Sequence, residues 1–196
     1  MAQDEKKKTP QDRSSGRRKA KPVTAERLHK GALFYLERYA SSSANLRKVL
    51  MRRVERSARE YGTDRDEGMR LVDDLVERFQ HAGLLDDKAY AESRVASLLR
   101  RGTSIKAIRM KLAAKGVQAG LIDDVLQAVR DDNDIDTDLM AAVAYVRRRR
   151  IGPYRVKARE DYRDRDMAAL ARQGFSFDLA RKVLDADDPQ ELEELI

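Results

Sequence analysis

Cysteine is absent from the 196-residue chain, and histidine occurs only twice. The absence of cysteine excludes disulfides, thiolate nucleophiles and thiolate metal sites, a pattern that fits a reducing compartment. No run of the sequence approaches the roughly 18 apolar residues of a membrane helix, and the first residues contain no hydrophobic signal segment. We therefore expect a cytoplasmic protein that does not enter the membrane.

The sequence also has few signals of catalysis. Neither GxGxxG nor GxxxxGK[ST] occurs, so no phosphate-binding loop is indicated. His29 and His81 have no His or Cys partner at metal-ligand spacing, which favours a structural or solvated role for both. The aspartates of residues 132–138 resemble the start of a calcium loop, but Thr137 and Val143 stand where Gly and Glu are required. We expect a linker there whose last aspartate caps the next helix.

A second group of acidic residues lies further along the chain. Asp161, Asp164 and Asp166 alternate with Arg163 and Arg165 on an expected helix. Ion pairs within that helix explain this pattern better than the two-metal site of a nuclease. We therefore expect no catalytic residue, no metal and no cofactor. A nuclease that uses the scattered carboxylates is the weakest of three functional hypotheses.

Positive charge is abundant and unevenly distributed. The formal net charge is +7, and residues 1–22 alone carry +5, including Arg17, Arg18 and Lys19. Residues 1–23 have no apolar periodicity and are rich in Lys, Ser, Gly and Pro, which predicts a disordered basic tail. This tail is either a solubilising segment or an arm that binds nucleic acid.

Within the expected folded part, arginines form three clusters. They lie at Arg52-Arg53, at Arg100-Arg101 and at the run of Arg147, Arg148, Arg149 and Arg150, while residues 185–194 are acidic. Four consecutive helical positions point about 100° apart, so at least two arginines of the run should be exposed. The run is either a solvated helix end that complements the helix dipole or a contact for phosphate or carboxylate groups. Nucleic acid is the first partner to consider.

Apolar residues recur at helical spacing along the whole folded part, and no alternating pattern indicates a strand. The clearest stripe ends at Phe79, followed by Gly83 in the place of a left-handed helix terminator. Ser43, Asp86 or Asp87, and Ser104 are expected helix N-caps. The pattern predicts three units of about three helices each, at residues 24–83, 84–131 and 132–196.

One segment of the sequence is repeated. Residues 112–126 align without gaps on residues 170–184, and the coincident positions are the apolar face and the turn glycine, Gly116 or Gly174. A shared core with a varied surface indicates repeated architecture. Such units are too small to fold alone, so they stack into an elongated and curved all-α body.

The order of several short motifs resembles the RecX family. These motifs are Gly83-Leu84-Leu85-Asp86-Asp87, then Tyr90-Ala91, Arg101-Gly102 and a segment from Ile108 that closes with Lys115-Gly116. The resemblance covers about residues 32–184, and its motif residues are typical of caps, turns and core, with Leu84 and Leu85 expected to pack in the core. The basic tail lies outside the family pattern, and residues 55–67 form an unusually long connection between two expected helices.

The resemblance implies tandem three-helix repeats that bind the groove of the RecA recombinase filament and restrain ATP hydrolysis and strand exchange. We also expect a monomer that is not an enzyme and that binds single- and double-stranded DNA weakly and in a salt-sensitive way. The alternative is a general nucleic-acid-binding protein without a dedicated protein partner. Binding through phosphate contacts alone should weaken steeply with salt, whereas a filament clamp with protein contacts should be less sensitive.

Overall fold

The structure is a computed structural model that describes residues 22–132 and 136–196. Within these residues the chain forms ten α-helices and two short 3-10 helices, with no β-strand. The expected all-α fold is therefore confirmed. Residues 1–21, which include Arg17, Arg18 and Lys19 of the expected tail, lie outside the described residues. None of the helices in the described part is both long and apolar enough to cross a membrane.

The first group of helices comprises α1 (Ala25–Leu36), α2 (Ser43–Tyr61) and α3 (Arg65–His81). They enclose a core that includes Leu28, Leu50 and Leu75. The expected long connection over residues 55–67 is wrong, because α2 continues as far as Tyr61. The short turn that follows uses Gly62 in the left-handed conformation at φ 67°.

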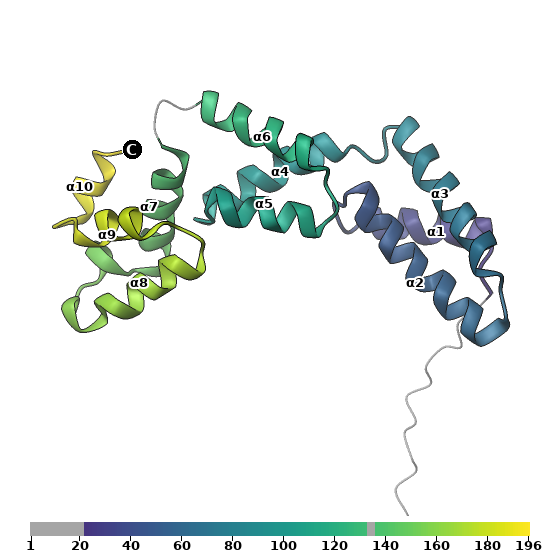
Figure 1. Cartoon of the computed structure of the whole chain (residues 1–196), viewed down its shortest axis with the longest axis horizontal. Helices are drawn as coiled ribbons and strands as arrows, with labels where there is room; N and C mark the ends of the chain where they lie inside the picture. The colour runs from purple at the N-terminus through teal and green to yellow at the C-terminus, as the bar shows by residue number, and fades with distance from the viewer. Residues whose placement is uncertain (1–21, 133–135) are drawn as a thin grey trace, which may run out of the picture.

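Two further groups of helices follow in the chain. The second comprises α4 (Asp87–Arg100), α5 (Ile105–Ala114) and α6 (Ala119–Asp131). The third comprises α7 (Thr137–Arg149), η1 (Gly152–Tyr154), η2 (Glu160–Tyr162), α8 (Arg163–Arg172), α9 (Phe177–Asp185) and α10 (Pro189–Glu193). Each group has its own cluster of buried apolar residues. The three groups, called units below, follow one another along the long axis of the molecule and form a curved row (Figure 1).

The repeated sequence segment adopts the same local structure twice. Gly116 and Gly174 both have positive φ, at 75° and 90°, and each lies in the turn before the last long helix of its unit. The aligned Leu112 and Leu170 are both fully buried. The repetition read from the sequence is therefore confirmed as a repeated helix–turn–helix.

The junctions between units repeat as well. Ser42 is the N-cap of α2, and its hydroxyl also donates a hydrogen bond to the backbone oxygen of Lys115 in the second unit. Ser104 is the N-cap of α5, and its hydroxyl donates to the backbone oxygen of Gln173 in the third unit at 2.7 Å. Each serine therefore caps its own helix and contacts the last turn of a helix in the next unit. The expected cap at Ser43 is wrong by one residue.

A carboxylate from the following unit completes each junction. Asp87 accepts a hydrogen bond from the backbone N–H of Ser43 at 2.7 Å, and Asp138 accepts one from the backbone N–H of Ile105 at 2.7 Å. Each carboxylate therefore binds the first residue of a helix in the preceding unit, where orphan N–H groups favour an acceptor. Asp86 caps α4 as expected. Asp136, and not Asp138, caps α7, so that part of the linker expectation is wrong.

Two other expectations are corrected by the tertiary contacts. Leu84 was expected to pack in the core, but its side chain is 52% exposed, whereas the adjacent Leu85 is buried. The acidic residues of segment 161–166 do not pair within their helix. Arg163 instead pairs with Asp185 of α9 at 2.6 Å, and Asp166 binds Arg155, which precedes the helix.

Candidate partner and nucleic-acid interface

The arginines at the ends of α4 and α7 occupy equivalent positions. The N–H of Thr103 donates to the carbonyl of Leu98 at 3.0 Å, and the N–H of Ile151 donates to the carbonyl of Val146 at 3.1 Å, so the two helices end with the same hydrogen bond. When residues are counted from Leu98 in α4 and from Val146 in α7, the two arginine clusters occupy the same place at the end of the helix. Sequence reasoning missed this correspondence because the run in α7 is longer.

The end of α4 packs against α7. The backbone of Gly102, at the end of α4, packs so closely on α7 that a Cβ atom there would lie 2.5 Å from the backbone nitrogen of Tyr145. Arg100 and Arg101 therefore lie beside the helix that carries the arginine run. The structure therefore places the end of α4 against α7 at Tyr145, about one helical turn before the end of the arginine run.

The four arginines of the run are all exposed and have different surroundings. Nη1 of Arg147 lies 3.8 Å from Oε1 of Glu193 in α10, so the acidic C-terminal end lies against one side of the run. The guanidinium of Arg148 lies 5.9 Å from the ring centre of Tyr145. Arg149 points into a hollow, and Arg150 ends the helix in the left-handed conformation at φ 53°. As helix geometry predicts, the four arginines of the run therefore do not form a single charged face.

The hollow beside Arg149 has a volume of about 400 Å³ and lies within the third unit. We call it the arginine hollow. Its walls contain four arginines, two tyrosines, one aspartate and two apolar residues: Tyr145, Arg149, Ile151, Arg155, Tyr162, Arg165, Asp166, Ala169 and Arg172. The positions 165, 169 and 172 are one helical face of α8, where a small residue between two arginines leaves room for a ligand. That spacing is the signal by which the sequence could have revealed this site.

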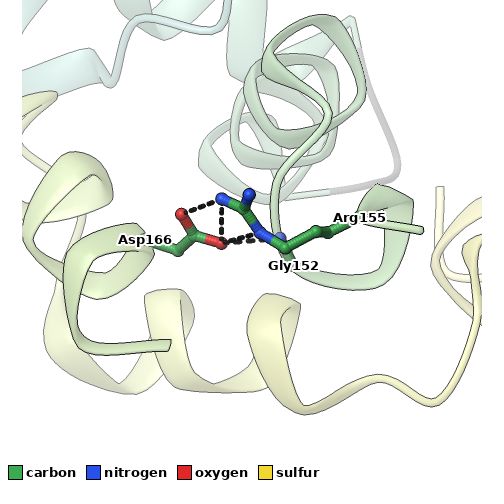
Figure 2. Close-up of polar contacts among 3 residues, drawn as sticks. All are labelled: Gly152, Arg155 and Asp166. Atoms are coloured by element: carbon green, nitrogen blue, oxygen red, sulfur yellow. Dashed lines mark hydrogen bonds and ion pairs between the residues drawn. The ribbon is translucent and has the colours of Figure 1, made fainter. Parts of the chain in front are cut away.

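One ion pair in the wall of the hollow is buried (Figure 2). Asp166 is only 3% exposed, and its Oδ1 accepts a hydrogen bond from Nη2 of Arg155 at 2.8 Å. Its Oδ2 also accepts a hydrogen bond from the backbone N–H of Gly152 at 3.1 Å. Because these contacts fix the guanidinium, Arg155 is held over the ring of Tyr162, 4.4 Å from its centre.

The remaining arginines of the hollow are not neutralised in this way. No carboxylate of residues 22–132 or 136–196 forms an ion pair with Arg149, Arg165 or Arg172. Because Asp166 offsets only Arg155, the hollow carries a net charge of about three positive units from these side chains. Such a site attracts anions.

The first candidate cluster lies far from this region, on α2 at the other end of the row (Figure 1). Arg53 lies across α1, since a Cβ atom on Gly31 would meet its guanidinium at 1.8 Å. Arg52 belongs to an exposed basic stripe at helical spacing, called the α2 stripe: Lys48, Arg52, Arg56 and Arg59. Sequence reasoning found only one member of the stripe because it considered adjacent arginines.

The histidines and acidic residues provide no evident site for metal chemistry in the described part. His29 packs edge-on against Phe79, with ring centres 5.3 Å apart, and Nδ1 of His81 lies 3.0 Å from the backbone oxygen of Glu77. No group of three His, Cys, Asp or Glu side chains among the described residues is placed to hold a metal ion.

Comparison with known proteins gives one consistent answer. Residues 86–126 match the family model described as RecX, second three-helix domain. The regulatory protein RecX of Myxococcus xanthus is 40% identical over 175 residues, which cover 88% of this chain and 91% of that protein. The regulatory protein RecX of Agrobacterium fabrum is 32% identical over 167 residues, covering 84% of this chain and 85% of that protein.

A solved structure agrees in fold. The crystal structure of RecX from Lactobacillus salivarius superimposes with a TM-score of 0.55 at 18% identity, covering 87% of this chain and 97% of that chain. The sequence similarity extends over most of both chains, and the expected RecX motifs lie at the caps and turns described above. The chain therefore belongs to the RecX family of regulatory proteins.

Proposed function

We propose that the protein binds the filament that the RecA recombinase forms on DNA, lies in its groove, and restrains ATP hydrolysis and strand exchange. The observation that carries the proposal is membership of the RecX regulatory family over 88% of the chain. The shape of the protein suits this role, because a slender curved row of small units can follow a helical groove (Figure 1).

In this proposal the third unit supplies the main charged contacts. The arginine run at the end of α7 and the neighbouring Arg100 and Arg101 are exposed at one junction, where they would meet DNA phosphates or acidic recombinase side chains. Arg52 and Arg53 at the far end would make secondary contacts. The basic residues of the first segment, Arg17, Arg18 and Lys19, would add salt-sensitive attraction to DNA.

Co-sedimentation with RecA filaments tests the proposal. Filaments are formed on single-stranded DNA with a slowly hydrolysed nucleotide, and the protein is added at moderate salt. We expect it to sediment with filaments much more than with RecA alone or with DNA alone. Equal sedimentation with bare DNA and with filaments would contradict the proposal.

The second candidate function is general nucleic-acid binding without a protein partner, which the net charge of +7 and the uncompensated arginines of the hollow favour. The two functions differ in salt dependence. Binding through phosphate contacts alone loses affinity steeply between low and moderate salt, whereas binding with added protein contacts loses less. A salt titration of the co-sedimentation assay therefore distinguishes them.

A further inference from the structure

We propose that the arginine hollow is a binding site for single-stranded nucleic acid. Backbone phosphates of one or two nucleotides lie against Arg149, Arg165 and Arg172, and one unpaired base lies against the ring of Tyr162. The inference rests on the proposed function, because a filament groove would present nucleic acid to this face, and it names the chemistry that the hollow recognises.

The hollow gathers positive charge at a concave site. Arg165 and Arg172 project from one face of α8, and Arg149 approaches from the end of α7. All three are exposed, and none has a carboxylate partner among the described residues. Guanidinium groups match phosphate oxygens in geometry as well as in charge. An anion with several oxygens is therefore the expected occupant.

An aromatic side chain, Tyr162, lines the hollow beside these arginines. Tyr162 is 38% exposed, although the guanidinium of Arg155 lies 4.4 Å from the centre of its ring and that of Arg165 lies 5.9 Å away. The guanidinium of Arg155 is held by the buried carboxylate of Asp166 (Figure 2). The ring is thus held close to Arg155, and the residue remains partly open to solvent. Exposed rings beside cationic grooves are the platforms on which unpaired bases stack.

The size of the hollow limits which ligand can enter it. A volume of about 400 Å³ is that of a small-molecule pocket and suits one or two nucleotides. A duplex is too wide to enter, and its bases are hidden from an aromatic ring. An acidic peptide could satisfy the arginines but has no planar group to cover the exposed part of Tyr162. The hollow therefore favours a single strand over both.

The test measures binding of the full chain to a labelled oligothymidylate, to a duplex of equal length and to a poly-glutamate peptide. The triple variant Arg149→Gln, Arg165→Gln, Arg172→Gln should bind the single strand at least tenfold more weakly, and its salt slope should fall by about 0.7 to 1.4 units for one or two lost phosphates. The matched control changes Arg52, Arg56 and Arg59 of the α2 stripe to Gln. With the same loss of charge, it should lose less than about threefold.

The ring is tested separately. Tyr162→Ala should weaken single-strand binding by at least about fivefold and leave duplex binding unchanged, whereas Tyr162→Phe should bind normally. The chain has no tryptophan, so Tyr162→Trp places a single indole at the rim. Its fluorescence should be quenched by the oligothymidylate and not by poly-glutamate, because only a base can stack on it.

Three results would overturn the inference. They are equal losses in the two triple variants, quenching as strong with poly-glutamate as with DNA, and tighter binding of the duplex than of the single strand. Because these measurements use no recombinase, their failure leaves the filament proposal intact. Conversely, a failure of filament co-sedimentation with normal single-strand binding would remove the filament proposal and leave the hollow as a nucleic-acid site.

Discussion

Arg150 has a left-handed backbone conformation, and at the equivalent position of the second unit this conformation is adopted by a glycine. Gly102 ends α4 at φ 71°, and Arg150 ends α7 at φ 53° in the equivalent position. A residue with a Cβ atom pays about 1 kcal/mol or more in the left-handed region. An exposed, strained arginine next to a cationic hollow is better explained by a charged contact than by stability of the helix end.

The strain at Arg150 gives a direct prediction. Arg150→Gly should raise the free energy of unfolding by roughly 0.5–1 kcal/mol, because glycine adopts this conformation without steric cost. Thermal unfolding followed by circular dichroism should show a midpoint higher by about 2–3 °C. The matched control, Arg149→Gly, removes the same charge from a residue in helical conformation and should lower stability by about 1 kcal/mol. Equal effects of the two substitutions would refute the strain argument.

Asp138 is the residue whose protonation should affect stability. Burial raises its pKa above the ordinary value of 3.8, and the hydrogen bond from Ile105 opposes this only in part. Because the folded protein then binds the proton more tightly than the unfolded chain, this carboxyl weakens folding as pH rises from about 4 through the raised pKa. Above the raised pKa of Asp138, this loss of folding stability is complete.

Asp138→Asn should remove this dependence, since the amide oxygen still accepts the hydrogen bond from Ile105 without a buried charge. The free energy of unfolding of the variant relative to the parent protein, measured in urea, should increase when the pH is raised from about 4.5 to about 7. Asp138→Ala is the control. It leaves the Ile105 N–H without its partner and should cost about 1–3 kcal/mol at both pH values. If the Asn variant instead lost stability relative to the parent protein as the pH is raised, the upward direction of the Asp138 pKa shift would be wrong.

At the scale of the element, the same junction is used twice. A serine N-cap donates to a carbonyl of the next unit, and an aspartate of that unit accepts from the first residue of the same helix. These contacts have fixed directions, so they set how one unit is oriented on the next more tightly than apolar packing alone. The curvature of the row follows from repeating one junction.

Two serine substitutions separate the cap from the junction. Ser104→Ala removes the hydrogen bond from Ala107 to the cap and also leaves the Gln173 carbonyl without its donor. Ser176→Ala removes only the cap of α9. We expect losses of about 2 kcal/mol and about 1 kcal/mol, respectively, in chemical denaturation. Equal losses would mean that the hydroxyl of Ser104 contributes nothing across the junction.

The elements could be predicted from the sequence and the sites between them could not. Apolar spacing and turn glycines such as Gly83, Gly116 and Gly174 act locally, so they revealed the helices and their repetition. Asp166 was misread because the rule for pairs within a helix ignores a partner that precedes the helix, here Arg155. The arginine hollow combines α7, the 3-10 turns and α8, and only the packing of the unit brings these segments together.

At the scale of the whole molecule, the basic first segment and the row of units should act independently. Removing residues 1–22 takes away a net charge of +5 and none of the residues in the three cores. We expect weaker binding to bare DNA and a flatter salt slope, by about 0.9 units for each lost duplex phosphate or about 0.7 on a single strand. Thermal stability should not change.

The truncated chain also tests which part of the molecule restrains the recombinase. It should still inhibit ATP hydrolysis by RecA at moderate salt, because the arginine run and its neighbours are retained. Loss of inhibition together with normal folding would show that the first segment, and not the row of units, is the principal binding element.

In the proposed function the third unit makes the charged contacts that restrain the RecA filament, and reversing the charge of the arginine run tests these contacts. Changing Arg147, Arg148, Arg149 and Arg150 to Glu inverts the charge of the run, while the adjacent core residues Val143 and Val146 stay in place. The variant should keep its helical circular dichroism spectrum. Its inhibition of filament ATP hydrolysis should fall at least tenfold, which corresponds to about 1.4 kcal/mol.

The matched control reverses the four charges of the α2 stripe, Lys48, Arg52, Arg56 and Arg59, and should reduce inhibition much less. Inhibition is measured as the concentration of protein that halves the rate of ATP hydrolysis by preformed filaments at moderate salt. We expect at least a tenfold higher concentration for the α7 variant than for the parent chain. A folded α7 variant that inhibits at full strength would show that the arginine run is only a solvated helix end and makes no contact with the filament.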